Sequence, residues 1–323
     1  MNKKILFNTW QGAFFNEGGG EVQLRKSREY LEKLGCQVDL YDMWAPQKEF
    51  DILHQFSIQY GVNFVVESYK TLGYKIALST IMWDLPGQDD PYYYHIKNLF
   101  NHSDILLTNS DLESKKLADA FGIEISKFHK TRNSIADEYR NTDTNEDFQK
   151  KFNISGDFVL SVANIDTRKN THNLIQACAE LDLNLVSVGH IRDNQYYDSF
   201  KDQYSNFQHV GNVDDIALLK SAYQQCKLFA LPSLCETPGI AALEAASQGT
   251  KIVITSEGAA PEYFGSKVTY VNPYELEDIT EGLRSELHLN RDASLRKHVI
   301  DCFTWDKTAL DIVDGYNKII CVS

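Results

Sequence analysis

The stretch KLFALPSLCETPGIAALEAASQGTKIVIT, residues 227–255, predicts a strand, a helix and a second strand in succession. The apolar runs at both of its ends are short, as buried parallel strands are, and an alanine-rich segment lies between them. Thr237 is a good helix N-cap, and Pro238 fits the first helical position, where a missing N–H costs nothing. The stretch therefore predicts a helical crossover between two strands of a parallel sheet.

Two glutamates bracket this predicted helix start. Glu236 is expected just outside the helix and Glu244 almost two turns inside it, while the amides of Gly239 and Ile240 fall among the first-turn donors that lack intrahelical partners. Such a helix start suits a polar ligand rich in hydroxyls and phosphates. An ordinary capped helix with a solvated glutamate at each end explains these residues more simply. This stretch alone does not distinguish a ligand-binding helix start from an ordinary one.

The same alternation of short apolar runs and amphipathic segments extends along most of the 323 residues, which predicts an α/β fold with parallel sheets covered by helices. A polar segment at residues 141–153 is the best candidate linker, so we expect two doubly wound, Rossmann-like domains, residues 1–150 and 151–302, with a ligand cleft between them. The expected strands are 3–8, 37–41, 50–56, 75–81, 104–110, 158–164, 183–189, 207–213, 227–233, 251–255 and 267–271, and the clearest helices are 21–35, 111–122, 171–182, 214–226 and 274–287.

Composition excludes several classes of protein. With 45 acidic and 32 basic residues the net charge is −13, which argues against non-specific binding to nucleic acid or to an anionic membrane. The six cysteines show no C-x-x-C pair and fit a reducing compartment. The first apolar run is too short for a signal peptide, and none is long enough to span a membrane. We therefore expect a cytoplasmic protein that is at most peripherally bound to a membrane.

Two further loops that follow predicted strands offer donors or positive charge. In the first half, Gly18, Gly19 and Gly20 lead into a helix and would let the backbone approach a phosphate closely, although a flexible surface loop is an equal alternative. In the second half, Arg168 and Lys169 precede a helix start, where the helix dipole disfavours cations unless an anion is bound. Two solvated surface cations remain the alternative explanation. A sugar nucleotide fits this set of groups.

Three motifs of the second half resemble the nucleotide-binding domain of GT-B glycosyltransferases, specifically the large retaining family 4. They are SVANIDTRKN at 161–170, NFQHVGNV at 206–213, and the segment that contains Glu236 and Glu244 as the family's E-x7-E pair, followed by a G-x-x-P-E at 258–262. The first half matches more weakly, through GGGE at 18–21, DILLTNSDLESKKL at 104–117 and KTRNSIADEY at 130–139. The resemblance covers essentially the whole chain and favours the ligand-binding interpretation of the helix start.

The resemblance implies a retaining transfer of a hexose from a nucleoside-diphosphate sugar to a glycan or lipid-linked glycan acceptor, in bacterial surface polysaccharide synthesis. It implies that residues 303–323 form a helix that returns to the first domain, with Trp305 and Tyr316 as packing residues. A sugar-nucleotide epimerase or hydrolase of the same fold, or a non-catalytic partner subunit, remains the alternative.

The same resemblance suggests roles for individual residues. Arg168, Lys169 and the glycine amides would stabilise the leaving diphosphate without a metal or other cofactor. Glu236 would hold the hexose or stabilise the positive charge that develops on it, and Glu244 would hold the ribose. The remaining donor contacts are expected from Thr237, from the amides of Gly239 and Ile240, and from the backbone of Asn212 and Val213 near the base.

Two positions depart from the family pattern. The histidine that often follows the fourth N-terminal strand is absent, and STIMWD at 79–84 makes Asp84 the replacement candidate, with an ordinary loop aspartate nearly as plausible. Asn133-Ser134 stands where an Asn-Gly is usual, which leaves the backbone geometry of that loop open.

Overall fold

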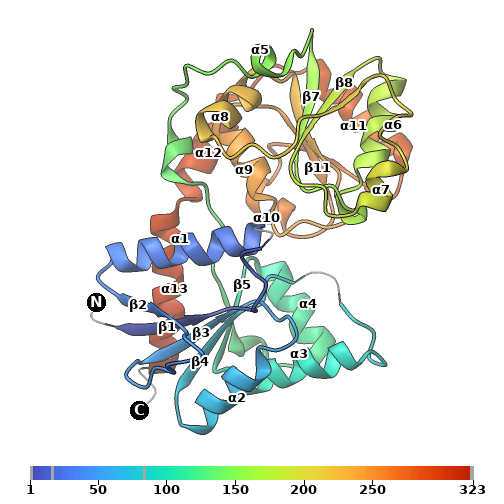
Figure 1. Cartoon of the computed structure of the whole chain (residues 1–323). Coiled ribbons are helices and arrows are strands. Elements are labelled where there is room, and N and C mark those ends of the chain that lie inside the picture. Colours follow the sequence, from blue (N-terminus) through green and yellow to red (C-terminus); the bar gives the residue numbers. More distant parts are fainter. Residues whose placement is uncertain (1–2, 16–17, 83–84, 321–323) are drawn as a thin grey trace. The chain divides into compact units, whose positions relative to one another are not determined.

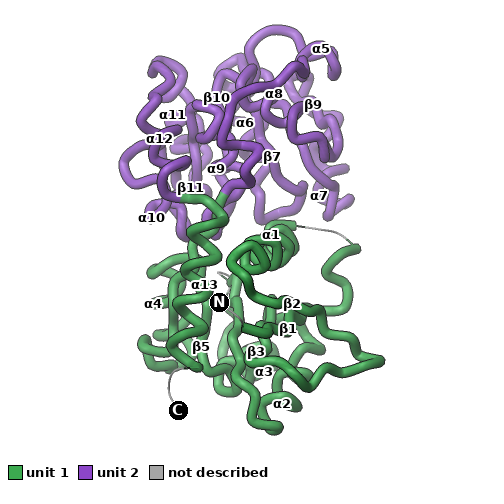
Figure 2. The backbone as a smooth tube through the Cα atoms, turned by 90° about the vertical axis from the view of Figure 1, so that its left-hand side faces the viewer, with its two compact units in different colours: residues 1–134, 303–323 green, residues 135–302 purple. Residues whose placement is uncertain are grey.

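The computed structural model describes residues 3–15, 18–82 and 85–320. The chain divides into two compact units, residues 1–134 with 303–323 and residues 135–302 (Figures 1 and 2). Within the described residues, each unit contains one six-stranded sheet whose paired strands are all parallel. The doubly wound α/β architecture expected from the alternating sequence pattern is therefore present.

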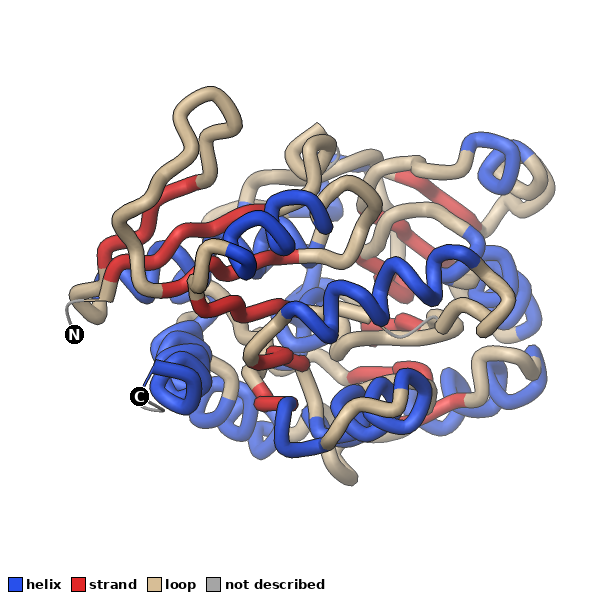
Figure 3. Tube along the Cα trace, turned by 90° about the horizontal axis from the view of Figure 1, so that it is seen from below, coloured by secondary structure: helices blue, strands red, loops and turns tan. Residues whose placement is uncertain are grey.

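The first unit has the strand order β2-β1-β3-β4-β5-β6. Two buried clusters cover its faces, one with α1 and α13 and the other with α2, α3 and α4, so helices lie on both sides of the strands (Figure 3). Its elements are β1 (Lys4–Asn8), α1 (Gly19–Lys33), β2 (Gln37–Leu40), β3 (Ile52–Phe56), α2 (Asn63–Thr71), β4 (Lys75–Ser79), α3 (Pro91–His102), β5 (Ile105–Thr108), α4 (Asp111–Phe121), η1 (Ile125–Lys127), β6 (Phe128–Lys130) and α13 (Trp305–Ile320).

The C-terminal helix α13 packs in the first unit, because it presents a continuous apolar stripe to the sheet. Trp305 and Tyr316 are buried in this interface, as expected, and the Tyr316 hydroxyl contacts Nδ1 of His54 at 2.6 Å. Burial lowers the pKa of His54 to about 3, so this imidazole is neutral at physiological pH. Gly315 allows α13 to lie close to the sheet, since a Cβ at this position would lie 2.8 Å from the ring of His129.

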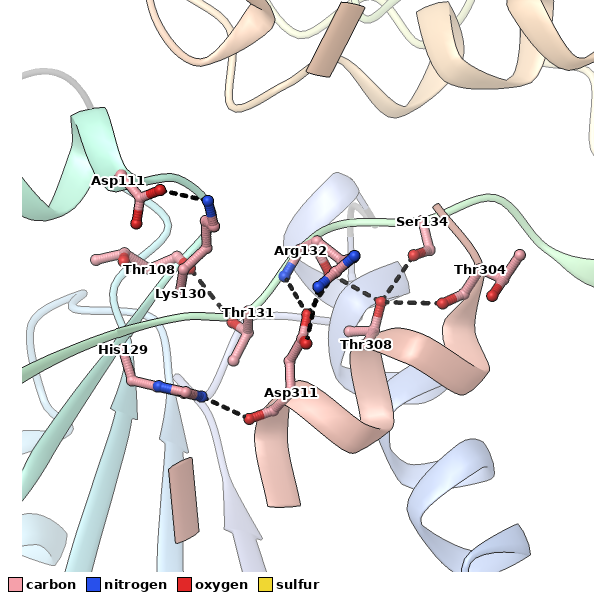
Figure 4. Close-up of polar contacts among 10 residues, drawn as sticks. All are labelled: Thr108, Asp111, His129, Lys130, Thr131, Arg132, Ser134, Thr304, Thr308 and Asp311. Atoms are coloured by element: carbon pink, nitrogen blue, oxygen red, sulfur yellow. Dashed lines mark hydrogen bonds and ion pairs between the residues drawn. The ribbon is translucent and has the colours of Figure 1, made fainter. Parts of the chain in front are cut away.

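Polar contacts fix the first turns of α13 to the segment after β6 (Figure 4). The guanidinium of Arg132 donates to both carboxylate oxygens of Asp311, at 2.7 and 3.1 Å, and its own amide donates to the same carboxylate. The hydroxyls of Ser134 and Thr308 lie 2.7 Å apart, and Thr308 donates to the carbonyl of Arg132. These bonds hold together the two segments by which the chain leaves and re-enters this unit.

The second unit has the strand order β12-β11-β10-β7-β8-β9, with a buried cluster that packs α6, α7 and α11 against one face of the sheet. Its elements are η2 (Asp137–Arg140), α5 (Phe148–Phe152), β7 (Phe158–Val162), η3 (Thr167–Lys169), α6 (Thr171–Glu180), β8 (Asn184–Val188), α7 (Asn194–Asp198), β9 (Phe207–His209), α8 (Ile216–Gln225), β10 (Leu228–Leu231), α9 (Ile240–Ser247), β11 (Ile252–Thr255), α10 (Ala260–Phe264), β12 (Thr269–Val271), α11 (Leu276–Leu287) and α12 (Ala293–Cys302).

Residues 135–150, which the sequence analysis assigned to the first domain, pack in the second unit. Phe148 is fully buried there, and its amide donates to the hydroxyl of Ser221. The ammonium of Lys220 donates to the side chain of Asn141 at 2.6 Å. The polar composition of this segment suggested a linker, but its contacts with α8 place the boundary between units at residues 134 and 135.

Candidate functional site

The second sheet gathers most of the expected donor-binding residues at one edge. Because its strands are parallel, the loops after β7, β9, β10 and β11 all leave from their carboxyl ends. Arg168 and Lys169 follow β7, Asn212 and Val213 follow β9, and the segment from Glu236 to Ile240 follows β10. Strands β7 and β10 are direct neighbours, so the first and third of these loops are adjacent.

The centre of this candidate site is an ion pair between Lys169 and Glu236. The ammonium Nζ of Lys169 lies 2.5 Å from Oε1 of Glu236, and the two side chains are 22% and 6% exposed. The loops are also joined through their backbones, since the amide of Leu234 donates to the carbonyl of Arg168 at 2.8 Å. The structure thus brings together one cation and one carboxylate that are 67 positions apart in the sequence.

The structure explains why asparagine, Asn170, is the third residue of the R-K-N motif. It adopts a left-handed conformation (φ 56°) at the N-cap position of α6, and it makes no side-chain cap there. Its amide Nδ2 instead donates to the carbonyls of Pro232 and Pro273, at 3.1 and 2.7 Å. Asn170 therefore ties the Lys169 loop to the loops after β10 and β12.

The backbone of Glu236 is held by the loop after β11. The amide of Glu236 donates to the carbonyl of Glu257, and the carbonyl of Glu236 accepts from the amide of Ala259 at 2.8 Å. Gly258 adopts a φ of +100°, and a Cβ there would lie 2.1 Å from the carbonyl oxygen of Glu236. The glycine of the G-x-x-P-E motif is therefore required for the close approach that positions Glu236.

The predicted start of α9 was wrong by two residues. The helix begins at Ile240 and its N-cap is Gly239, which has φ 84° and ψ 81°; Thr237 and Pro238 precede the helix. The left-handed conformation of Gly239 turns the chain into α9, a role that an L residue fills at a steric cost. A Cβ at Gly239 would lie 3.5 Å from Oε2 of Glu236, so this carboxylate is next to the helix start as expected.

Glu244 lies on α9 between two buried tyrosines that the sequence analysis did not identify. The hydroxyl of Tyr223 donates to Oε2 of Glu244 at 3.0 Å, and Tyr139 also hydrogen-bonds to this carboxylate. Burial raises the pKa of Glu244 to about 7, an effect that the two hydroxyls oppose. Tyr139 comes from η2 and Tyr223 from α8, so no local sequence signal connects them to Glu244.

Two other expected donor-binding residues of this unit, Arg168 and Asn212, are more exposed than Lys169 and Glu236. Arg168 has a side chain that is 58% exposed and lies 3.2 Å from the carboxylate of Asp166. Asn212 is exposed and donates to the carboxylate of Asp214, while Val213 is buried. Arg168 is thus placed at the sheet edge without the burial that distinguishes Lys169.

The glycine loop of the first unit forms the start of α1. Gly18 is the N-cap, and its amide donates to the carboxylate of Glu21 at 2.8 Å, so this one of the three glycine amides already has an anionic acceptor. Gly19 and Gly20 are the first helical residues, whose amides lack intrahelical acceptors. Asp84 lies outside the described residues.

Two features are absent from the described part of the chain. No cluster of three or more His, Cys, Asp or Glu side chains is arranged to hold a metal ion there. None of the helices in the described ranges combines the length and apolar character that crossing a membrane requires.

Solved structures share this architecture over nearly the full chain. A glycosyltransferase from Rickettsia africae ESF-5 superposes with a TM-score of 0.79 at 16% identity and covers 100% of both chains. HepE of Anabaena, solved in complex with UDP, gives a TM-score of 0.76 at 16% identity, covering 98% of this chain and 100% of that one. At these identities the likeness concerns the fold, and it confirms the predicted GT-B class.

Residues 142–301 match the model of the family Glycosyl transferases group 1. This part of the chain therefore matches the glycosyl transferases group 1 family, and the predicted resemblance is confirmed at that level; membership of the retaining family 4 stays a prediction.

Two curated relatives are mannosyltransferases. The serotype-specific mannosyltransferase WbdA of Escherichia coli is 24% identical over 243 residues, which cover 68% of this chain and 29% of the relative. An MMP alpha-(1->4)-mannosyltransferase of Mycolicibacterium hassiacum is 32% identical over 112 residues, covering 32% of this chain and 26% of the relative. The matches thus span less than a third of the length of either relative.

Proposed function

We propose that this protein transfers a hexose from a nucleoside-diphosphate sugar to a hydroxyl of a glycan or lipid-linked glycan acceptor, with retention of the anomeric configuration. The bond between the anomeric carbon and the diphosphate oxygen breaks, and the acceptor oxygen bonds to the same face of that carbon. The acceptor proton passes to the leaving phosphate oxygen. No protein nucleophile and no metal ion takes part in this scheme.

The Lys169–Glu236 pair is the observation that carries the proposal. As the glycosidic bond breaks, positive charge develops on the sugar and negative charge on the diphosphate, only a few atoms apart. Glu236 and Lys169, which are in contact, place one negative and one positive charge together in the candidate site. Backbone hydrogen bonds of the Arg168, Leu234 and Glu236 segments hold the two loops together, which favours a preorganised site.

The other residues of the sheet edge complete the proposed donor site. The amides of Gly239 and Ile240 donate to hydroxyls of the hexose, and the backbone of Asn212 and Val213 contacts the base. Glu244 accepts from the ribose hydroxyls: a carboxylate has about four acceptor positions, so two tyrosine hydroxyls leave room for two further donors. Arg168 contributes to diphosphate binding.

The relatives suggest which donors to test first. Both named relatives are mannosyltransferases, and HepE was solved with UDP bound, so nucleoside-diphosphate mannose and UDP-hexoses are the leading candidates. An acceptor made at the inner face of a membrane would require peripheral association of this chain. We propose that the product becomes part of a surface polysaccharide.

Nucleotide release from a panel of these donors, measured with and without oligosaccharide acceptors, tests the proposal. We expect release that depends on the acceptor and a product whose anomeric configuration, determined by NMR, matches that of the donor. Release of nucleotide without acceptor would indicate a hydrolase. Inversion at one carbon of the donor's sugar, with the nucleotide still attached, would indicate an epimerase. A chain that binds no donor would be a non-catalytic partner subunit, and the proposal would be wrong.

A further inference from the structure

Three aromatic side chains form a compact cluster at the carboxyl edge of the first sheet. The proposed donor site does not include them. The rings of Tyr60 and Tyr92 are 4.9 Å apart, those of Tyr60 and His95 are 4.6 Å apart, and those of Tyr92 and His95 stack at 5.5 Å with an angle of 14°. We call these three residues the aromatic platform. Tyr60 is 60% exposed, whereas Tyr92 and His95 are half-buried beneath it.

Backbone carbonyls hold the platform in place. Nε2 of His95 donates to the carbonyls of Ile58 and Gln59, at 2.8 and 3.2 Å, and the hydroxyl of Tyr92 donates to the carbonyl of Ile58. Because both partners are carbonyl oxygens, Nε2 of His95 carries a proton. The platform is therefore rigid in its lower layer, and its upper ring is accessible.

The platform lies where ligands bind in folds of this kind. Tyr60 belongs to the loop after β3, and Tyr92 and His95 belong to the first turns of α3, which follows β4. Strands β3 and β4 are direct neighbours, so both segments leave the same edge of the sheet. In open parallel sheets, the carboxyl edge of the strands is the side on which ligands bind.

The chemistry of the platform fits a neutral sugar ring. Aromatic faces carry negative partial charge and pack against the polarised C–H groups of a pyranose face, while the sugar hydroxyls point outward to polar groups at the ring edges. The acidic residues Asp89 and Asp90 precede α3, and the chain carries a net charge of −13. This charge is unfavourable for anionic lipid headgroups, which cationic side chains attract.

We propose that Tyr60, with Tyr92 and His95 beneath it, forms a carbohydrate-stacking subsite that holds a neutral sugar ring of the acceptor. This proposal rests on the proposed transfer to a glycan and names a contact on the acceptor side. It predicts that the subsite binds sugar in the absence of donor, since none of the groups of the second sheet takes part.

Binding of short oligosaccharides to the full chain without donor tests the subsite. Saturation-transfer NMR and calorimetry are carried out with α-linked trisaccharides of mannose, glucose and galactose. We expect at least one of them to bind the wild-type protein, and Tyr60→Ala to bind it about tenfold more weakly, because the exposed stacking face is lost. Tyr60→Phe, which keeps the ring, should bind within about twofold of the wild type.

The matched control is Leu72→Ala, which removes a similarly exposed apolar side chain (65% exposed) after the last residue of α2, whereas Tyr60 lies before its start. This variant should bind the trisaccharide normally. Nucleotide-sugar binding, measured by thermal shift, should be unchanged in every variant and reports separately on the donor site.

Three outcomes would overturn the subsite: no binding of any trisaccharide, equal binding by Tyr60→Ala, or sedimentation with phosphatidylglycerol vesicles that depends on Tyr60 in place of sugar binding. The proposed function fails separately, through the absence of acceptor-dependent nucleotide release in a protein that still binds the trisaccharide.

Discussion

The ammonium of Lys169 lies 2.5 Å from the carboxylate of Glu236, and this contact joins the loops that follow the neighbouring strands β7 and β10. The two residues are far apart in the sequence, and the pairing of β7 with β10 in the sheet brings their loops together. In the proposed reaction the two charges act on opposite ends of the bond that breaks.

Lys169→Ala should lower kcat/KM for the donor by the loss of roughly 2.7–4 kcal/mol of transition-state stabilisation, as for removal of a preorganised electrostatic donor. Steady-state kinetics measures this loss. Arg168→Ala is the comparison, because its side chain is 58% exposed and paired with Asp166, and its loss should be smaller. Near-normal kinetics of Lys169→Ala would show that the Lys169–Glu236 ion pair has no role in catalysis.

Transfer activity should survive chelation. The proposed site meets the diphosphate charge with Lys169, Arg168 and backbone amides, so a divalent cation has no assigned task. Initial rates in excess EDTA should equal those in untreated protein, and added magnesium or manganese should not raise them. Complete loss in EDTA that either ion restores would show that this part of the account is wrong.

Glu244 should make the stability of the protein depend on pH in an unusual direction. Its folded-state pKa of about 7 exceeds the ordinary value of 4.5, so the folded state holds the proton more tightly than the unfolded state. The stabilisation from this group is therefore present below about pH 4.5 and is lost as the pH rises through 7. Glu244→Gln should have a higher Tm than the wild type at pH 8 and a similar Tm at pH 5.

Differential scanning fluorimetry across this range, without nucleotide, measures the effect. A constant difference in Tm between the two proteins at all pH values would show that Glu244 has an ordinary pKa in the folded state.

Gly258→Ala should disturb both folding and catalysis, because a Cβ would collide with the backbone of Glu236 and because φ at this position is +100°. Gly249→Ala is the matched control, since that glycine has φ +77° and open space around it. The control should cost only the backbone penalty of about 1–2 kcal/mol. Gly258→Ala should lower Tm further and reduce kcat in the molecules that remain folded; equal effects of the two variants would contradict this role.

Much of this architecture could be predicted from the sequence, because hydrophobic periodicity is a local property. The strands and helices around residues 227–255, and the two-sheet architecture, follow from apolar runs that the chain must bury. The start of α9 could not be predicted correctly, since Thr237 has the composition of an N-cap whereas the chain turn uses the left-handed Gly239. The boundary at residue 134 depends on the burial of Phe148 against α8, a long-range contact.

The candidate site was predictable where a residue's role is carried by its own charge. Lys169 and Glu236 were identified because a cation and a carboxylate at strand ends are visible in the sequence. The functions of Asn170, Tyr139 and Tyr223 depend on partners from other loops and helices, so no single stretch indicated them. Gly18 also differs from expectation, because Glu21 already occupies its amide.

The kinetics of Glu236→Gln and Glu244→Gln, compared in one assay, test the central claim most directly. Glu244 is proposed to contact ribose hydroxyls that do not change during reaction, so Glu244→Gln should mainly raise the donor KM. Glu236 is proposed to face the carbon on which positive charge develops, so Glu236→Gln should lower kcat more than it raises KM. If both variants lose only affinity, or if Glu244→Gln has the larger fall in kcat, the assignment of the two glutamates is wrong.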